Sequence, residues 1–175
     1  MRKIIIEINN KLLLLLKLVI IGYLMLPGPS FVYALPQGAS VESGDVSFNY
    51  ENDNTLKITA SDDAIINYTS FDIGNNEFVY FIQSGADAAV LNRVIGTNAS
   101  NILGGLSANG IIFLINQNGI SFASTANVNA ASLVASTHNI LNQDFLAHSY
   151  VFQKELQNAS SIVNKGILKA VDGGY

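Results

Sequence analysis

Short apolar runs separated by Asn and Gly are the dominant pattern in the chain after Ala34. The clearest run, residues 111–115, consists of branched and aromatic side chains and is too short for a helix. This pattern predicts a β-strand that is buried on both faces. The next four residues, Asn116, Gln117, Asn118 and Gly119, predict a tight turn in which Gly119 takes a positive φ.

A short unit, Asn-Gly-Ile-x-Phe, recurs in this part of the chain. It occupies residues 109–113 and 118–122, and a looser version stands at residues 164–168. Recurring short strands with turn residues between them are typical of stacked β-coils. Asn is conspicuously frequent in the part of the chain that follows Ala34. At equivalent turns these side chains would form amide ladders between coils; alternatively, Asn is frequent here only because it favours turns.

Polar and apolar positions alternate in residues 46–50 and 56–59, and a polar segment at residues 51–54 separates them. This alternation predicts an antiparallel hairpin. Such a hairpin would cover the first coil of a stack, whose backbone groups would otherwise lack partners. No segment after residue 35 holds a long 3.6-residue period, so we expect almost no helix in this part of the chain. The Ala-rich residues 123–137 are the place most compatible with a helical turn.

Residues 1–34 form a block with the layout of a secretory signal peptide. Basic residues precede the apolar segment 12–26, which Lys17 alone interrupts, and two prolines follow. Val32 and Ala34 have the spacing of the small residues before a cleavage site, so we expect cleavage between Ala34 and Leu35. A permanent membrane anchor is the alternative, but its uninterrupted apolar stretch is short for a membrane span.

Composition and charge narrow the range of partners. After Ala34 the chain carries five Lys and Arg against twelve Asp and Glu. Its basic residues are not clustered, so nucleic acid and anionic membrane surfaces are not expected as partners. The sequence has no Cys, and an exported domain without disulfides must be held together by packing and backbone hydrogen bonds.

The residues that enzymes and metal sites use are scattered along the chain. The adjacent acidic pair Asp62 and Asp63 fits a solvated turn better than a lyase or glycosidase site, which needs grouped carboxylates. Arg93 is the single Arg after Ala34, and His138 and His148 are well separated, without a recognisable third ligand. We therefore expect no catalytic residues, no metal and no cofactor.

Two segments resemble motifs of a known family. FLINQNGISFA, residues 113–123, and LVAST, residues 133–137, are similar to motifs in the N-terminal secretion domain of filamentous haemagglutinin-type exoproteins, the passengers of two-partner secretion. Further short matches follow in the family's order, so the resemblance covers residues 35–175.

The chain also departs from the family pattern. Gln117 replaces a frequent Pro, and Ala123, Ala131 and Ser132 replace frequent glycines. If those glycines hold positive φ, each replacement is destabilising by about 1 kcal/mol or more unless the turn changes.

The resemblance implies an all-β fold: a right-handed, single-stranded parallel β-helix of the pectin-lyase-like kind. It also implies an N-terminal β cap and an extra antiparallel hairpin. Residues 1–34 would be the signal peptide and residues 35–175 the two-partner secretion domain, which we expect to be truncated at its C-terminal end.

The same resemblance implies a non-enzymatic function. The domain would be the secretion signal that an outer-membrane transporter barrel with periplasmic docking domains recognises, and it would nucleate β-helix folding at the surface of a Gram-negative bacterium. Asn116, Gln117, Asn118 and Gly119 match the family's most recognisable motif. They would either contact the transporter directly or only shape the fold. The alternative function is a short secreted adhesin that binds a host glycan or protein.

Overall fold

The structure, a computed structural model, describes residues 34–153 and 160–171 of the chain. The expected signal peptide, residues 1–34, therefore lies outside the described residues except for Ala34. Within the described part of the chain, no helix is long and apolar enough to span a membrane.

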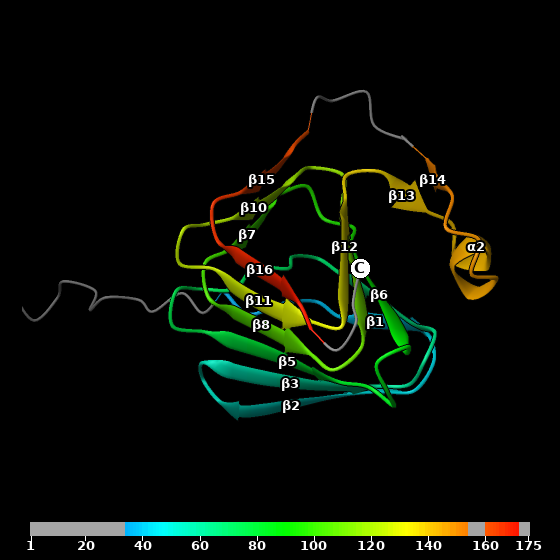
Figure 1. The fold of residues 1–175 in the computed structure, drawn as a ribbon, viewed down its shortest axis with the longest axis horizontal. Helices are drawn as coiled ribbons and strands as arrows, with labels where there is room; N and C mark the ends of the chain where they lie inside the picture. Colours follow the sequence, from blue (N-terminus) through cyan, green and yellow to red (C-terminus); the bar gives the residue numbers. More distant parts are fainter. Residues whose placement is uncertain (1–33, 154–159, 172–175) are drawn as a thin grey trace, which may run out of the picture. The chain divides into compact units, whose positions relative to one another are not determined.

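The described chain forms a β-solenoid of about four turns, which confirms the prediction of stacked β-coils. Three sheets surround the interior of the solenoid (Figure 1). The first sheet contains β2 (Val46–Asn52), β3 (Thr55–Ala60), β5 (Phe78–Ile82), β8 (Gly105–Ala108), β11 (Asn127–Ala130) and β16 (Ile167–Ala170). The second contains β1 (Ser40–Ser43), β4 (Ala64–Tyr68), β6 (Ala89–Val94), β9 (Ile111–Asn116) and β12 (Ser132–Ser136). The third contains β7 (Ser100–Ile102), β10 (Ile120–Phe122) and β15 (Ile162–Asn164).

Neighbouring coils pair in parallel, and their register stacks apolar residues on one another. Phe113 of β9 lies beside Leu91 of β6, which in turn lies beside Ile65 of β4. Because side chains alternate between the two faces of a strand, this register produces one row of apolar side chains outside the solenoid and another inside it.

The N-terminal end is covered by antiparallel strands. β2 pairs with β3 across the predicted turn, which confirms the hairpin. β3 also pairs in parallel with β5 and is therefore the first strand of the first coil. The second cap strand is β1, which runs antiparallel to β4. The cap thus consists of β1 and β2, and not of the hairpin alone.

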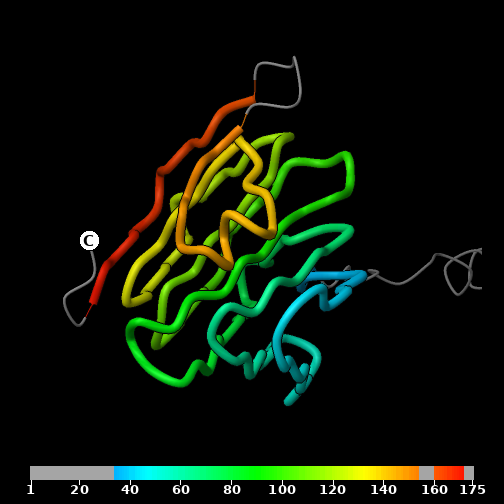
Figure 2. Tube along the Cα trace, turned by 90° about the vertical axis from the view of Figure 1, so that its right-hand side faces the viewer, coloured from blue at the N-terminus to red at the C-terminus, as the bar shows by residue number. Residues whose placement is uncertain are grey.

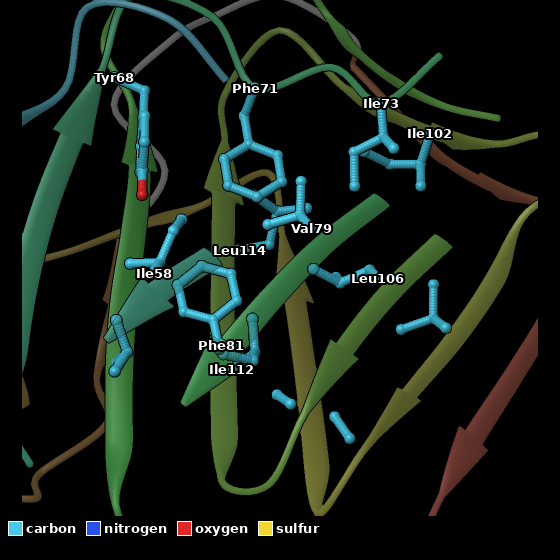
Figure 3. Close-up of a cluster of buried hydrophobic side chains, with 14 of the residues drawn as sticks. Ile58, Tyr68, Phe71, Ile73, Val79, Phe81, Ile102, Leu106, Ile112 and Leu114 are labelled. Carbon is cyan, nitrogen blue, oxygen red and sulfur yellow. The ribbon is translucent and has the colours of Figure 1, made fainter. Parts of the chain in front are cut away.

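The interior of the solenoid is a continuous apolar core. Figure 3 shows Ile112 and Leu114 of β9 among side chains from the other sheets, including Phe81. Each fully buried aliphatic or aromatic side chain stabilises the fold by roughly 1.5–3 kcal/mol. This interior also contains paired polar groups: the hydroxyl of Tyr68, for example, donates to Oδ1 of buried Asn92 at 3.2 Å. Burial, with a smaller contribution from Tyr50, raises the pKa of Tyr68, so the hydroxyl stays protonated and can donate.

A separate hairpin covers the outer face of the second sheet. It contains β13 (Asn139–Ile140), the short helix α2 (Asn142–Leu146) and β14 (Phe152–Gln153), and β13 pairs with β14 antiparallel. It lies beside the coils in orange in Figure 2. Phe145 of α2 packs edge-on against Phe113 of β9, with ring centroids 5.3 Å apart.

This hairpin explains why residues 111–115 are apolar at every position. Ile112 and Leu114 are buried in the interior core. Phe113 and Ile115 point the other way and are buried beneath the hairpin, in a cluster with its Ile140 and Phe145. The prediction of a strand buried on both faces is confirmed, although Ile111 itself is only partly buried. Residues 123–137 form no helix: a single turn, closed by the Ala126 N–H on the Ala123 oxygen at 3.0 Å, leads into β11 and β12.

Candidate functional site

The turn at residues 116–119 connects β9 to β10 at a corner of the solenoid. Gly119 has a φ of 112°, as the Asn-Gly pair predicted. Its N–H donates to the backbone oxygen of Asn116 at 3.0 Å, which closes the turn. A side chain at residue 119 would be strained, because this φ lies in the region that L-residues avoid.

Asn116 holds the turn together from inside. Its side chain is fully buried. Its Nδ2 donates to the backbone oxygen of Asn98 and to Oγ of Ser100, both at 3.0 Å. Its Oδ1 accepts the N–H of Asn118 at 2.9 Å. The side chain therefore ties its own turn to the corner of the preceding coil, and in the folded domain no partner can reach it.

The other residues of the turn differ in accessibility. Gln117 and Asn118 are partly exposed, whereas Gly119 is buried. The Nδ2 of Asn118 donates to the backbone oxygen of Gly96 at 2.9 Å. The structure thus brings the four predicted residues together in one turn and leaves only Gln117 and Asn118 within reach of solvent.

The repeated Asn-Gly unit marks corners that reach back to the preceding coil. Nδ2 of Asn109 donates to the backbone oxygen of Gln83 at 2.8 Å, and Oδ1 accepts the N–H of Gln83 at 2.7 Å. At the next corner, between β9 and β10, Nδ2 of Asn118 donates in the same way to the backbone oxygen of Gly96. Sequence reasoning found the unit but missed this role, for which the signal was an Asn placed directly before Gly at the start of a strand.

Arg93 has a structural position. Its Nε donates to Oδ1 of Asn139 at 2.8 Å, and Nη2 donates to the backbone oxygen of Ile140 at 2.6 Å. Nη1 donates to Oδ1 of Asn67 at 3.1 Å. Arg93 thereby links strands β4 and β6 to the covering hairpin.

The remaining polar candidates do not assemble into a catalytic or metal group within the described residues. Oδ1 of Asp62 accepts the N–H groups of Ala89, at 2.8 Å, and of Asp63, at 3.0 Å, as a turn residue does. Nε2 of His148 lies 3.6 Å from Oδ2 of Asp63. No group of three His, Cys, Asp or Glu side chains in the described part of the chain is placed to hold a metal ion.

The predicted cleavage site lies at the beginning of the described chain. Leu35 is 2% exposed and belongs to the interior core. The N–H of Ala34 donates to Oε1 of Glu77 at 2.7 Å, and Glu77 is itself only 5% exposed. The residues on the two sides of the expected cleavage point, Ala34 and Leu35, are thus held against the first coil.

A groove runs along the outer face of the first sheet. It has a volume of about 310 Å³, and Phe78 and Tyr80 of β5 lie in it with their rings stacked at 17° and their centroids 6.4 Å apart. Amide side chains of Asn75, Asn127 and Asn129 contribute to the same groove.

Comparison with known proteins identifies the family. Residues 33–175 match the family described as the TPS secretion domain. A heme/hemopexin-binding protein from Haemophilus influenzae is 32% identical over 145 residues, which cover 79% of this chain and 16% of that protein. Another heme/hemopexin-binding protein from the same species is 41% identical over 98 residues, which cover 56% of this chain and 11% of that protein. This chain therefore spans less than a fifth of the length of either relative.

The fold agrees with a solved structure of the same kind. The crystal structure of the HMW1 secretion domain from Haemophilus influenzae matches with a TM-score of 0.74 and 37% sequence identity, over 76% of this chain and 36% of that chain. The matched family comprises secretion domains and is not an enzyme family. On its sequence over residues 33–175 and on its fold, the chain belongs to the TPS secretion domain family of two-partner secretion exoproteins.

Proposed function

We propose that this domain is the secretion signal of a filamentous haemagglutinin-type exoprotein. The chain is exported by the Sec route, cleaved between Ala34 and Leu35, and kept unfolded in the periplasm. The periplasmic docking domains of an outer-membrane transporter barrel bind it there. It then folds at the surface of a Gram-negative cell and serves as the first coils of a longer β-helix. The family match supports a transporter as the partner.

The observation that carries the folding role is the difference between the two ends of the solenoid. At the N-terminal end, β1 pairs antiparallel with β4, and β2 pairs antiparallel with β3. These two strands cover the first coil. At the other end, no described strand pairs with the outer edges of β12, β15 and β16. There Val128, Leu133 and Leu168 line a groove of about 190 Å³. A further coil would pair with these edges and cover Leu133 and Leu168, which are still partly exposed, so the open end acts as a template.

The recognition role falls on Asn116, Gln117, Asn118 and Gly119 before they fold. The Asn116 side chain is inaccessible once the turn has formed. A transporter that contacts Asn116 must therefore bind the turn residues in the unfolded chain, which is the state in which the domain reaches the barrel.

Asn109 provides a matched control for this role, because it makes the same type of bond between coils outside the motif. Replacing either Asn116 or Asn109 by Ala leaves backbone groups without partners and should lower the unfolding free energy by about 1–3 kcal/mol. Each variant is co-expressed with the partner transporter, and the secreted and periplasmic amounts are measured by immunoblot. We expect Asn116→Ala to accumulate in the periplasm and Asn109→Ala to be secreted normally.

Equal secretion of the two variants would remove the recognition role of Asn116 while leaving the secretion function intact. Failure of the unmodified domain to leave the periplasm, although its transporter is present and functional, would contradict the secretion function itself.

A second candidate function, binding of a host glycan, rests on the groove beside Phe78 and Tyr80. Stacked aromatic rings provide apolar faces for sugar rings, and the neighbouring Asn amides provide hydrogen-bond partners for hydroxyl groups. Glycan-array binding by the folded domain tests this function. Tyr80→Ala should abolish any signal, whereas substitution of the exposed Tyr50 to Ala should not.

A further inference from the structure

Glu77 carries a buried carboxylate that has hydrogen-bond partners but no positively charged partner among the described residues. It is 5% exposed, yet it forms no ion pair with another described residue. One oxygen, Oε2, accepts the N–H of Gly74 at 2.7 Å, and the Glu77 N–H donates back to the Gly74 oxygen at 2.9 Å. These two bonds close the turn before β5. Only Oε2 of the carboxylate takes part in this turn, so Oε1 is available to another partner.

The other oxygen, Oε1, points at the start of the domain. It accepts the N–H of Ala34 at 2.7 Å. Buried carboxylates are normally compensated by a positive charge, because desolvation of an isolated charge is unfavourable. A neutral amide of the precursor provides a hydrogen bond but no such charge. Leu35, the next residue, is anchored in the core and fixes the chain at this place.

We propose that Glu77 is the binding site for the α-ammonium group that cleavage creates on Leu35. This inference rests on the cleavage step of the proposed function. Cleavage removes Ala34 and its N–H, and it converts the amide nitrogen of Leu35 into a cation. The two nitrogens are only three backbone bonds apart, a span of less than about 4 Å. The Leu35 nitrogen therefore needs only a small shift to replace the lost donor and to neutralise the buried carboxylate.

The consequence is that processing and folding are coupled. The folded domain is more stable when its chain begins at Leu35 than when the same nitrogen is an uncharged amide. A cap that is completed only by the cleaved N-terminus would favour folding of the processed chain over the precursor.

The effect of Glu77 on the Leu35 amine must be distinguished from the effects of other ionisable groups near Leu35. Tyr50 and Asp53 line a groove of about 310 Å³ together with Leu35, so Asp53 is the competing carboxylate. Asp53→Asn is therefore the matched control for Glu77→Gln, since each substitution removes one negative charge beside the same residue.

The test measures the pKa of the Leu35 α-amine in the refolded domain that begins at Leu35. Selective ¹⁵N labelling of leucine and NMR titration report it directly. We expect the folded pKa to exceed the ordinary value of about 7.7–8.0 by about one unit. Glu77→Gln should return it to the ordinary range, and Asp53→Asn should leave it raised. An α-amine that titrates in the ordinary range in the unmodified folded domain would overturn the proposal, even if Glu77→Gln fails to fold.

Stability provides a second readout. A raised pKa in the folded state stabilises fully below the unfolded pKa, and this stabilisation is lost as pH rises through the folded value. Acetylation of Leu35 should therefore lower the unfolding midpoint at pH about 7 and have little effect at pH about 10. Equal effects at both pH values would mean that Glu77 only closes its turn. Neither measurement involves a transporter, so the secretion function stands or falls separately.

Discussion

At the scale of single residues, the corners of the solenoid depend on Asn side chains and on glycines. The ladder of stacked amides is not the arrangement at Asn116, which lies beside Val94 of the neighbouring strand and instead bonds to the backbone of Asn98. The residues that replace the family's frequent glycines do not adopt a positive φ. Among the described non-glycine residues, only Asp63 and His148 have positive φ. Ala123 and Ala131 therefore avoid the strain that a left-handed conformation would impose.

Gly119 is a corner glycine whose backbone conformation disfavours any side chain. Its φ is 112°, and an added Cβ would lie 3.0 Å from the backbone oxygen of Ser161. Gly119→Ala should lower the free energy of unfolding by about 1–2 kcal/mol, measured by chemical denaturation. Gly85→Ala is the control, since a Cβ there meets nothing within 4 Å. A similar change for both variants would show that the positive φ of Gly119 is unimportant.

At the scale of elements, the strands followed from the residue pattern, whereas an extra antiparallel hairpin was expected from the family resemblance alone. The run at residues 111–115 identified β9, because continuous apolar side chains require two buried faces. Its sequence did not reveal what covers the outer face. That cover is a contact between Phe113 and Phe145, which lie far apart in the sequence, and no local pattern pairs two distant rings. The short helix α2 was missed because five residues are too few for a helical period.

For the candidate site, the sequence predicted the position and the turn conformation but not the burial of its side chains. The motif at residues 116–119 was located correctly, and the positive φ of Gly119 followed from its residue type. The burial of Asn116 did not follow, because it depends on contacts with Asn98 and Ser100 in the coil below. Register between coils determines such contacts, and sequence periodicity alone does not fix that register.

Phe145 is the residue that should hold the covering hairpin on the solenoid. It is fully buried and contacts Phe113, and Tyr150 lies 6.1 Å from its ring centre. Phe145→Ala should lower the unfolding free energy by about 3–5 kcal/mol. If the hairpin detaches locally, hydrogen exchange should rise in residues 139–153 while β5 and β8 stay protected. Leu146→Ala is the matched control, because Leu146 is 42% exposed. Unchanged exchange in Phe145→Ala would mean that Arg93 and the β13–β14 pairing hold the hairpin without it.

At the scale of the whole molecule, the two ends of the described solenoid differ: β1 and β2 cover the first coil, whereas no described strand pairs with the outer edges of β12, β15 and β16. Among the described residues that line the groove at this end, Lys169 is the only charged one, so the groove offers a largely apolar surface for stacking. A domain that nucleates further coils needs this asymmetry, because growth from both ends would also join molecules to one another. The cap strands β1 and β2 restrict growth to one direction.

The open end also predicts how a chain of residues 35–175 behaves alone. Leu168 is 38% exposed and stands beside Val128 in the register of β16 on β11. Two molecules can cover Leu168 and the partly exposed Leu133 by meeting end to end, so we expect concentration-dependent dimers in sedimentation velocity experiments. Leu168→Lys places a charge in the contact and should weaken dimerisation by tenfold or more, which corresponds to about 1.4 kcal/mol. Ile82→Lys is the control, because Ile82 is similarly exposed, at 45%, on β5 away from the open end. A strictly monomeric domain, or equal weakening by both variants, would show that the open end has no affinity for another β edge and would remove the physical basis for templating.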